Sequence, residues 1–158
     1  MKHTLQALVE NRFGVLARIA SLFSARGFNI ESLAVGETHD PTISCMTIVV
    51  DASDELILDQ IKKQLRKLID VISVSDLTRK DFIDRELVLL KVNIRKKKEL
   101  EEIKKLCKNY HASILAKKPR YCIIQIVEDT SKTKSFLEEI EKYGIKELVR
   151  TGRVAISK

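Results

Sequence analysis

The fold is decided by the stretch Leu8-Val9-Glu10-Asn11-Arg12-Phe13-Gly14-Val15-Leu16 and by the segment Arg26-Gly27-Phe28-Asn29-Ile30 that follows it. Apolar residues between them recur at spacings of four and seven, which places them on one helix face: Val15, Leu16, Ile19, Ala20, Leu22 and Phe23. Gly27 stands just past this helix, where a left-handed residue commonly ends one. Before it, residues 3–9 alternate as a strand does. The pattern predicts a strand, a short polar turn and a helix.

The polar turn at residues 11–16 is the best candidate site for chemistry in the chain. The first backbone N–H groups of a helix have no partner inside the helix and can bind a carboxylate. Gly14 has no Cβ and so permits a ligand to approach the backbone closely. We therefore expect a sensor of a small anionic or zwitterionic molecule. In the simpler alternative, Gly14 is only a turn glycine and Asn11 only a helix-capping residue.

Composition restricts the function classes. The 158 residues are enough for one medium domain or two small ones, and no apolar run approaches the ~20 residues of a membrane span. The N-terminus lacks the pattern of a secretory signal. Cys45, Cys107 and Cys122 are far apart and odd in number, which favours reduced thiols over a disulfide or zinc site. We expect a cytoplasmic protein without a membrane partner.

The net charge of +7 lies entirely in the second half of the chain. Residues 1–80 carry ten basic and ten acidic side chains, whereas residues 81–158 carry nineteen and twelve. A basic half can attract an acidic partner, or it can simply be a solvated surface.

Both halves show the same order of elements, βαββαβ. The first half is expected to contain strands at 3–9, 30–37, 43–50 and 71–77, with helices at 14–26 and after Ser53 as N-cap. The second is expected to contain strands at 87–92, 112–116, 121–127 and 147–156, the last bent at Gly152, with helices at 97–110 and after Ser131 as N-cap. The fold class is therefore α+β, with two tandem ferredoxin-like domains.

The domain boundaries expected from this pattern are 1–77 and 85–158, joined by a linker at 78–84. In this topology the strand at 30–37 lies at a sheet edge with unpaired backbone groups. Pairing with its copy in a second molecule would remove both edges, and two-fold dimers are the commonest oligomers. We expect a homodimer that brings Asn29 and Ile30 of one chain near the turn of the other.

A specific resemblance lies in these same residues. The opening stretch resembles an ACT domain, the amino-acid-sensing βαββαβ module. The runs that narrow the resemblance are Leu22–Leu33, Asp40–Ile48 and Gln60–Val71 in the first half, with Arg85–Leu87 and Tyr143–Val154 in the second. Together they resemble the regulatory small subunits of acetolactate synthase (acetohydroxyacid synthase) over essentially the whole chain.

The resemblance implies a non-catalytic subunit that binds and activates a catalytic large subunit in branched-chain amino acid biosynthesis. It implies inhibition by valine or a related amino acid bound between two ACT domains. Thiamine diphosphate, magnesium and FAD would belong to the partner, with no cofactor on this chain. The implied effector-binding residues are Asn11, Arg12, Phe13, Gly14, Val15 and Leu16 of one chain, with Asn29 and Ile30 of the other. Phe13 departs from the family pattern, which commonly has proline or a small residue there.

Three other readings have less support. An RNA-binding module shares the βαββαβ order but stacks bases on strand aromatics, and only Tyr121 begins a suitable strand, so we expect no nucleic acid partner. An enzyme needs a cluster of catalytic groups, whereas His3, His39 and His111 lie in separate segments. A free-standing ACT sensor or transcriptional regulator remains the nearer alternative, although the chain has no helix-turn-helix segment.

Overall fold

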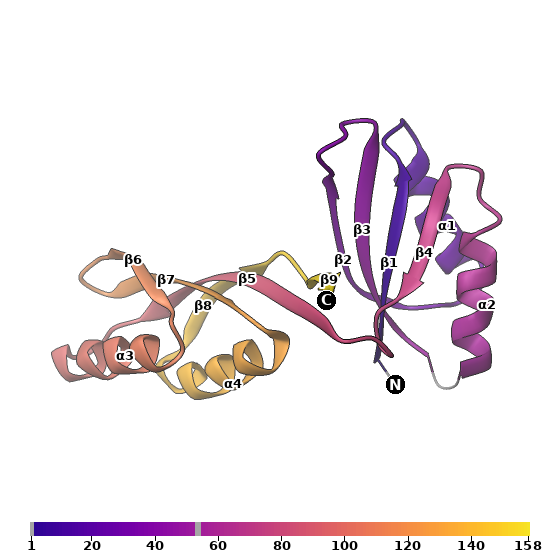
Figure 1. Cartoon of the computed structure of the whole chain (residues 1–158). Helices are drawn as coiled ribbons and strands as arrows, with labels where there is room; N and C mark the ends of the chain where they lie inside the picture. Colours follow the sequence, from indigo (N-terminus) through magenta and orange to yellow (C-terminus); the bar gives the residue numbers. More distant parts are fainter. Residues whose placement is uncertain (1, 53–54) are drawn as a thin grey trace. The chain divides into compact units, whose positions relative to one another are not determined.

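The computed structural model describes residues 2–52 and 55–158. The chain forms two compact units, one of residues 1–83 with 153–158 and one of residues 84–152. Their elements are drawn in Figure 1. The α+β class and the two βαββαβ repeats predicted from the sequence are confirmed.

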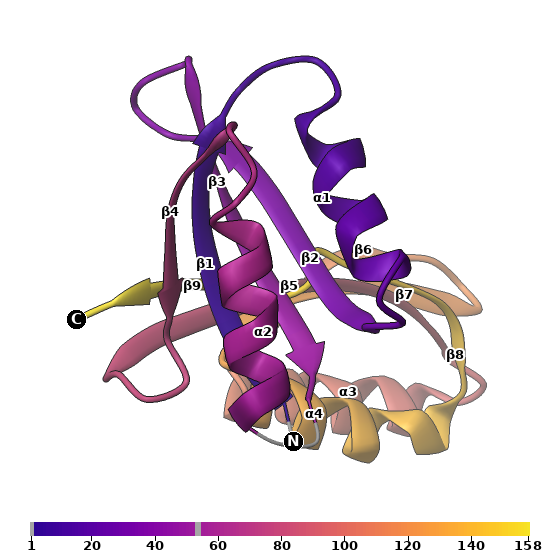
Figure 2. The same cartoon turned by 90° about the vertical axis from the view of Figure 1, so that its right-hand side faces the viewer.

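The first unit contains a four-stranded antiparallel sheet of order β2-β3-β1-β4. Two helices lie on the same face of this sheet, as Figure 2 shows. The predicted edge position of β2 is confirmed. The elements are β1 (Lys2–Glu10), α1 (Val15–Ser24), β2 (Ile30–Glu37), β3 (Ile43–Asp51), α2 (Glu55–Leu65) and β4 (Val71–Asp76).

Its core forms because strand alternation and helix periodicity bring apolar side chains to the same layer. Alternate residues of β1 and β3 face the helices, and residues of α1 and α2 spaced three and four apart pack against them. The central members are Leu5, Ala7, Val9, Met46, Ile48, Val50, Ile19, Phe23, Leu58, Ile61 and Leu65, each at most 2 % exposed.

The second unit repeats this construction, with a sheet of order β6-β7-β5-β8 and both helices on one face (Figure 1). Its buried residues include Val88, Leu90, Val92, Ile124, Ile126, Ile103, Phe136 and Ile140. The elements are β5 (Phe82–Asn93), α3 (Lys97–Asn109), β6 (Ser113–Lys117), β7 (Tyr121–Glu128), α4 (Thr130–Ile140), a 3₁₀ turn η1 (Glu141–Tyr143) and β8 (Ile145–Arg150).

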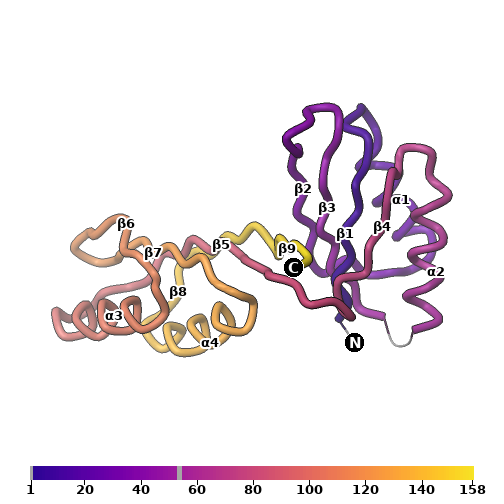
Figure 3. Tube along the Cα trace, viewed as in Figure 1, coloured from indigo at the N-terminus to yellow at the C-terminus, as the bar shows by residue number. Residues whose placement is uncertain are grey.

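The predicted last β segment at 147–156, bent at Gly152, is two strands in the structure, β8 and β9 (Val154–Ser157), with Gly152 in the turn between them. Gly152 has a φ of +78°, which turns the chain sharply at a conformation that glycine adopts readily. In β9, whose trace Figure 3 shows near the C-terminus, Ala155 O accepts a 3.0 Å hydrogen bond from Gln6 Nε2 of β1. Residues 153–158 thus group with the first unit, whereas the sequence-based division assigned them to residues 85–158.

Two details differ from expectation. The N-cap of α4 is Asp129, whose side chain accepts a hydrogen bond from Lys132 N, and Ser131 lies inside the helix. A carboxylate two positions earlier reaches the free N–H of the first turn, so the prediction of Ser131 was wrong. The segment expected to be a linker at 78–84 contains the first residues of β5. The predicted cap at Ser53 lies outside the described residues.

Candidate functional site

The turn between β1 and α1 has the open geometry expected for ligand binding. Gly14 is the N-cap residue of α1, with φ 82° and ψ −8°, and no side chain caps the helix. The first turn of α1 contains no acidic residue. Within residues 2–52 and 55–158, the backbone N–H groups of Phe13, Gly14 and Leu16 donate to no protein acceptor. These amides therefore face solvent at the positive end of a helix dipole.

Arg18 adds a full positive charge to this turn. Its Nε and Nη2 atoms each lie 2.8 Å from Asp70 Oδ2, and the Asp70 side chain is only 11 % exposed. The remaining nitrogen, Nη1, lies 3.2 Å from the position that a Cβ on Gly14 would occupy. Arg18 thus presents one free guanidinium edge beside the free amides, which suits a carboxylate.

Arg18 and Asp70 were not among the site residues predicted from the sequence. Arg18 is four residues after Gly14 and therefore lies above it on the same face of α1. This four-residue spacing was the sequence signal that could have placed Arg18 next to the turn. Asp70 had none, because it is 52 residues from Arg18 and only the fold brings the two together.

Asn11 ties the turn to neighbouring segments. Its Nδ2 donates to Glu37 Oε1 at 3.0 Å and to Pro41 O at 2.9 Å, and its backbone N donates to Thr42 O at 2.7 Å. The Oδ1 atom receives no hydrogen bond from the described part of the chain. It is therefore available to accept one from a ligand ammonium.

A cavity of about 390 Å³ lies beside Asn11 and Arg12. Pro41 and Thr42 form one wall, and the N–H and hydroxyl of Thr42 donate to Asp40. These donors hold the pKa of the Asp40 carboxyl below its usual value, so the loop is shaped around an ionised group. The full lining is Glu10, Asn11, Arg12, Pro41, Thr42, Ile43 and Ile72.

The other predicted residues of the turn take different positions. Phe13 is fully exposed, Leu16 is half exposed, and Val15 is buried in the core, where only its backbone can serve a ligand. Arg12 Nε pairs with Glu10 Oε2 at 3.1 Å. Phe13 thus forms an exposed apolar surface on a turn with several free amides, and no described residue of its own unit covers it.

Asn29 and Ile30 lie at the opposite end of the same sheet. Ile30 and His3 both pair with Val50, so the start of β2 is level with the start of β1. The turn follows the other end of β1, about 25 Å away at the usual rise per strand residue. Within one chain, the structure places Arg18 beside Gly14 but does not bring Asn29 or Ile30 to them.

Other kinds of site are not supported by the described residues. In residues 2–52 and 55–158 there is no group of three or more His, Cys, Asp or Glu side chains placed to hold a metal ion. None of the helices in those ranges has the length and apolar character that a membrane crossing requires.

Comparisons with known proteins agree over both halves. Residues 5–73 match the family of AHAS small subunit-like ACT domains, and residues 85–158 match the family described as the small subunit of acetolactate synthase. A probable acetolactate synthase small subunit of Archaeoglobus fulgidus is 46 % identical over 99 % of this chain and 96 % of its own length. The acetolactate synthase small subunit of Bacillus subtilis is 37 % identical over 100 % and 91 %.

A solved structure supports the same assignment. The crystal structure of the acetolactate synthase small subunit from Thermotoga maritima matches with a TM-score of 0.90 at 33 % identity, covering 100 % of this chain and 98 % of that one. Sequence and structure thus agree along the full chain. The chain belongs to the family of acetolactate synthase small subunits.

Proposed function

We propose that this chain is the non-catalytic, regulatory subunit of a cytoplasmic acetolactate synthase. It binds a catalytic large subunit, which carries thiamine diphosphate, magnesium and FAD, and raises its activity. Valine or a related branched-chain amino acid binds the regulatory subunit and inhibits the complex. Family membership supports the partner, and the open Gly14 turn beside Arg18 is the observation that carries the effector site.

The turn supplies groups for each part of an amino acid. The effector carboxylate binds the free amides near Gly14 and the Nη1 atom of Arg18, and the ammonium donates to Asn11 Oδ1. Binding at about 0.1 mM requires about 5.5 kcal/mol. A helix N-terminus contributes at most about 2 kcal/mol of this, so the remainder comes from Arg18, Asn11 and burial of the branched side chain.

A second protomer completes the site through β2. This edge strand ends with Glu37, which accepts the hydrogen bond from Asn11 at the turn end of the sheet. In an antiparallel pair of β2 strands, the start of one strand lies level with the end of the other. Asn29 of the partner subunit would then lie beside Glu37 and the turn. The homodimer therefore unites residues that one chain keeps about 25 Å apart.

Effector binding then changes activity because the site exists only in one dimer arrangement. A ligand shifts an equilibrium between arrangements by its difference in affinity for them, and couplings of about 1–3 kcal/mol are typical. The dimer arrangement that the effector favours must also activate the catalytic subunit less than the other arrangements do. Inhibition and activation are thus separate properties of the chain, and a variant can lose the first while keeping the second.

The test is to mix the purified chain with the catalytic large subunit of acetolactate synthase from the same organism. We expect acetolactate formation to accelerate several-fold, and valine, leucine or isoleucine to reverse the increase. An unchanged rate on mixing would contradict the regulatory role and favour a free-standing amino-acid sensor. A rate that rises but responds to none of the three amino acids would contradict only the effector site.

A further inference from the structure

A second cavity, in the unit formed by residues 84–152, has a strongly basic rim. It has a volume of about 460 Å³ and lies where α3 begins and the loop between β6 and β7 turns. The rim carries Arg95, Lys96, Lys97, Lys117 and Lys118. These five residues, here called the basic rim, come from two segments about twenty positions apart in the sequence.

The floor of this cavity is apolar. Ile94, Leu100 and Pro119 line it, and Ile94 and Leu100 are only 8 % and 6 % exposed. An apolar floor inside a charged rim is the arrangement of a protein interface, in which an apolar anchor is surrounded by polar contacts.

The side chains of the basic rim make no direct ion pair within the described ranges 2–52 and 55–158. The Glu99 carboxylate does lie beside the rim, and it accepts from the backbone N–H groups of Arg95 and Lys96. Other lysines of the same unit are paired, as Lys104 is with Glu101 and Lys132 with Glu128. Five adjacent cations without a direct ion pair repel one another, and an acidic ligand would relieve that repulsion.

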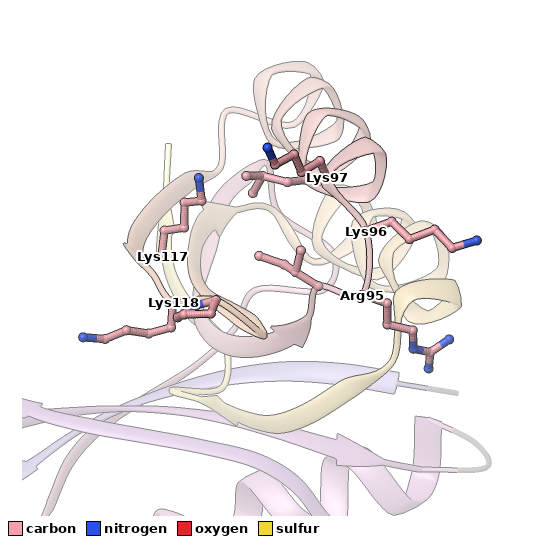
Figure 4. Close-up of a pocket in the computed structure, with 8 residues that line it drawn as sticks. Arg95, Lys96, Lys97, Lys117 and Lys118 are labelled. Atoms are coloured by element: carbon pink, nitrogen blue, oxygen red, sulfur yellow. The ribbon is translucent and has the colours of Figure 1, made fainter.

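A small free anion fits this cavity poorly. A carboxylate already lies at the start of α3, since Arg95 N and Lys96 N, just before the helix, donate to Glu99 Oε2 at 2.7 and 3.2 Å. The rim side chains also diverge: Figure 4 shows Arg95 and Lys96 pointing to one side and Lys118 to the other, whereas Lys97 and Lys117 both point toward the top of the view. A phosphate needs convergent donors, whereas separate charges around an apolar floor suit an extended acidic segment.

We infer that the basic rim and its apolar floor bind an acidic segment of a protein partner, with one apolar side chain in the cavity and Asp or Glu residues on either side of it. This inference rests on the proposed function, because the catalytic large subunit is the partner it assigns. Interface charges of this kind raise the association rate and select the partner. The basic half of the chain thereby acquires a role in assembling the complex.

The experiment measures the affinity of the full-length chain for the catalytic large subunit, with the double variant Lys117→Glu/Lys118→Glu. We expect affinity to fall about tenfold at low salt, because two of the five rim charges reverse sign. The difference should shrink at about 0.5 M salt, where charges are screened beyond about 4 Å. Lys105→Glu/Lys108→Glu is the matched control, since these exposed lysines of α3 lie outside the rim. It should keep the affinity of the parent.

Several outcomes would overturn the inference. Affinity retained by the rim variant, or lost equally by the control, would show that the rim is not the contact. The variant Lys117→Arg/Lys118→Arg keeps both positive charges and should bind as tightly as the parent. If it also binds weakly, the loss in the Glu variant comes from a disturbed fold of the rim and not from its charge. Saturable binding of inorganic tripolyphosphate or of a single-stranded RNA, lost in the rim variant, would assign the cavity to those ligands instead. Failure of the parent itself to bind the large subunit would overturn the proposed function, and this inference with it.

Discussion

Nη1 of Arg18 lies 3.2 Å from the position that a Cβ on Gly14 would occupy, and Asp70 holds the other two guanidinium nitrogens. The guanidinium is therefore fixed by a nearly buried carboxylate with its free edge toward the turn. Any side chain at position 14 would enter the space between the free amides and Arg18. Glycine at this position thus keeps the proposed carboxylate site open as well as allowing the positive φ.

A Gly14→Asp variant should activate the catalytic subunit normally and lose inhibition by the effector. Its carboxylate would stand beside Arg18 Nη1 and occupy the place of the effector carboxylate. Gly27→Asp is the matched control, because Gly27 also has a positive φ, of 66°, and has nothing within 4 Å of its added Cβ. Activity assays with and without valine measure the difference. Inhibition of the Gly14 variant at the valine concentration of the parent would refute the site.

An Asn29→Ala variant should bind the effector more weakly, although Asn29 lies at the far end of the sheet from Gly14. The reason is that its side chain would serve the site of the neighbouring protomer. Calorimetric titration measures the affinity. An unchanged affinity would argue against a site shared between protomers.

Mixing the Gly14→Asp and Asn29→Ala chains should restore part of the effector binding that each has lost. In a two-fold dimer of one chain of each kind, one site receives both substitutions and the other receives neither. Random pairing then leaves roughly a quarter of all sites intact. Titration of the mixture after subunit exchange counts these sites. A site formed within a single chain would show no recovery.

Arg153→Ala should destabilise the first unit by about 1–2 kcal/mol, the usual cost of removing a side-chain hydrogen bond to a buried partner. Arg153 Nη1 donates to Thr4 Oγ1 at 2.6 Å, and Thr4 is 2 % exposed. Urea denaturation measures the change. Arg85→Ala is the control, because the Arg85 guanidinium donates to the backbone oxygen of the adjacent Asp84 at 2.7 Å and not to a buried side chain of the first unit. Equal stability of the two variants would contradict this role for Arg153.

Asp129→Ala should cost about 1 kcal/mol of stability at neutral pH, whereas Ser131→Ala should cost little. The N–H of Lys132 donates to the Asp129 carboxylate and lowers its pKa below the usual 3.8. A lowered folded-state pKa stabilises the protein above 3.8, and this stabilisation is lost as pH falls through the folded value. The difference between parent and variant should therefore disappear in acid. Denaturation at pH 7 and near pH 2.5 tests this.

Cys107 and Cys122 should resist alkylation in the folded protein. They are 4 % and 0 % exposed, and burial raises the pKa of the Cys107 thiol to about 11. At pH 8 about one molecule in a thousand then carries the reactive Cys107 thiolate. Cys45 is only partly buried and should react first. Mass spectrometry after timed iodoacetamide treatment distinguishes the three, and fast labelling of Cys107 would contradict its packing.

Elements with strong local signals could be predicted from the order of residues alone. The α1 stripe and Gly27, the alternation in β1, and the turn at Gly152 each follow from backbone sterics and burial over a few neighbouring residues. The cap of α4 shows the limit of such signals. Asp129 and Ser131 are both good capping residues, and the choice depends on where the chain leaves β7.

The amino-acid order also identified the turn at residues 11–16, because glycine and asparagine before an apolar helix indicate free amides whatever surrounds them. Its surroundings depended on the fold. Asp70 orients Arg18 from 52 residues away, Glu37 and Pro41 hold Asn11, and residues 153–158 return to the first sheet. These contacts join residues far apart in the chain, and no local pattern encodes a distance that only the completed packing of sheets and helices creates.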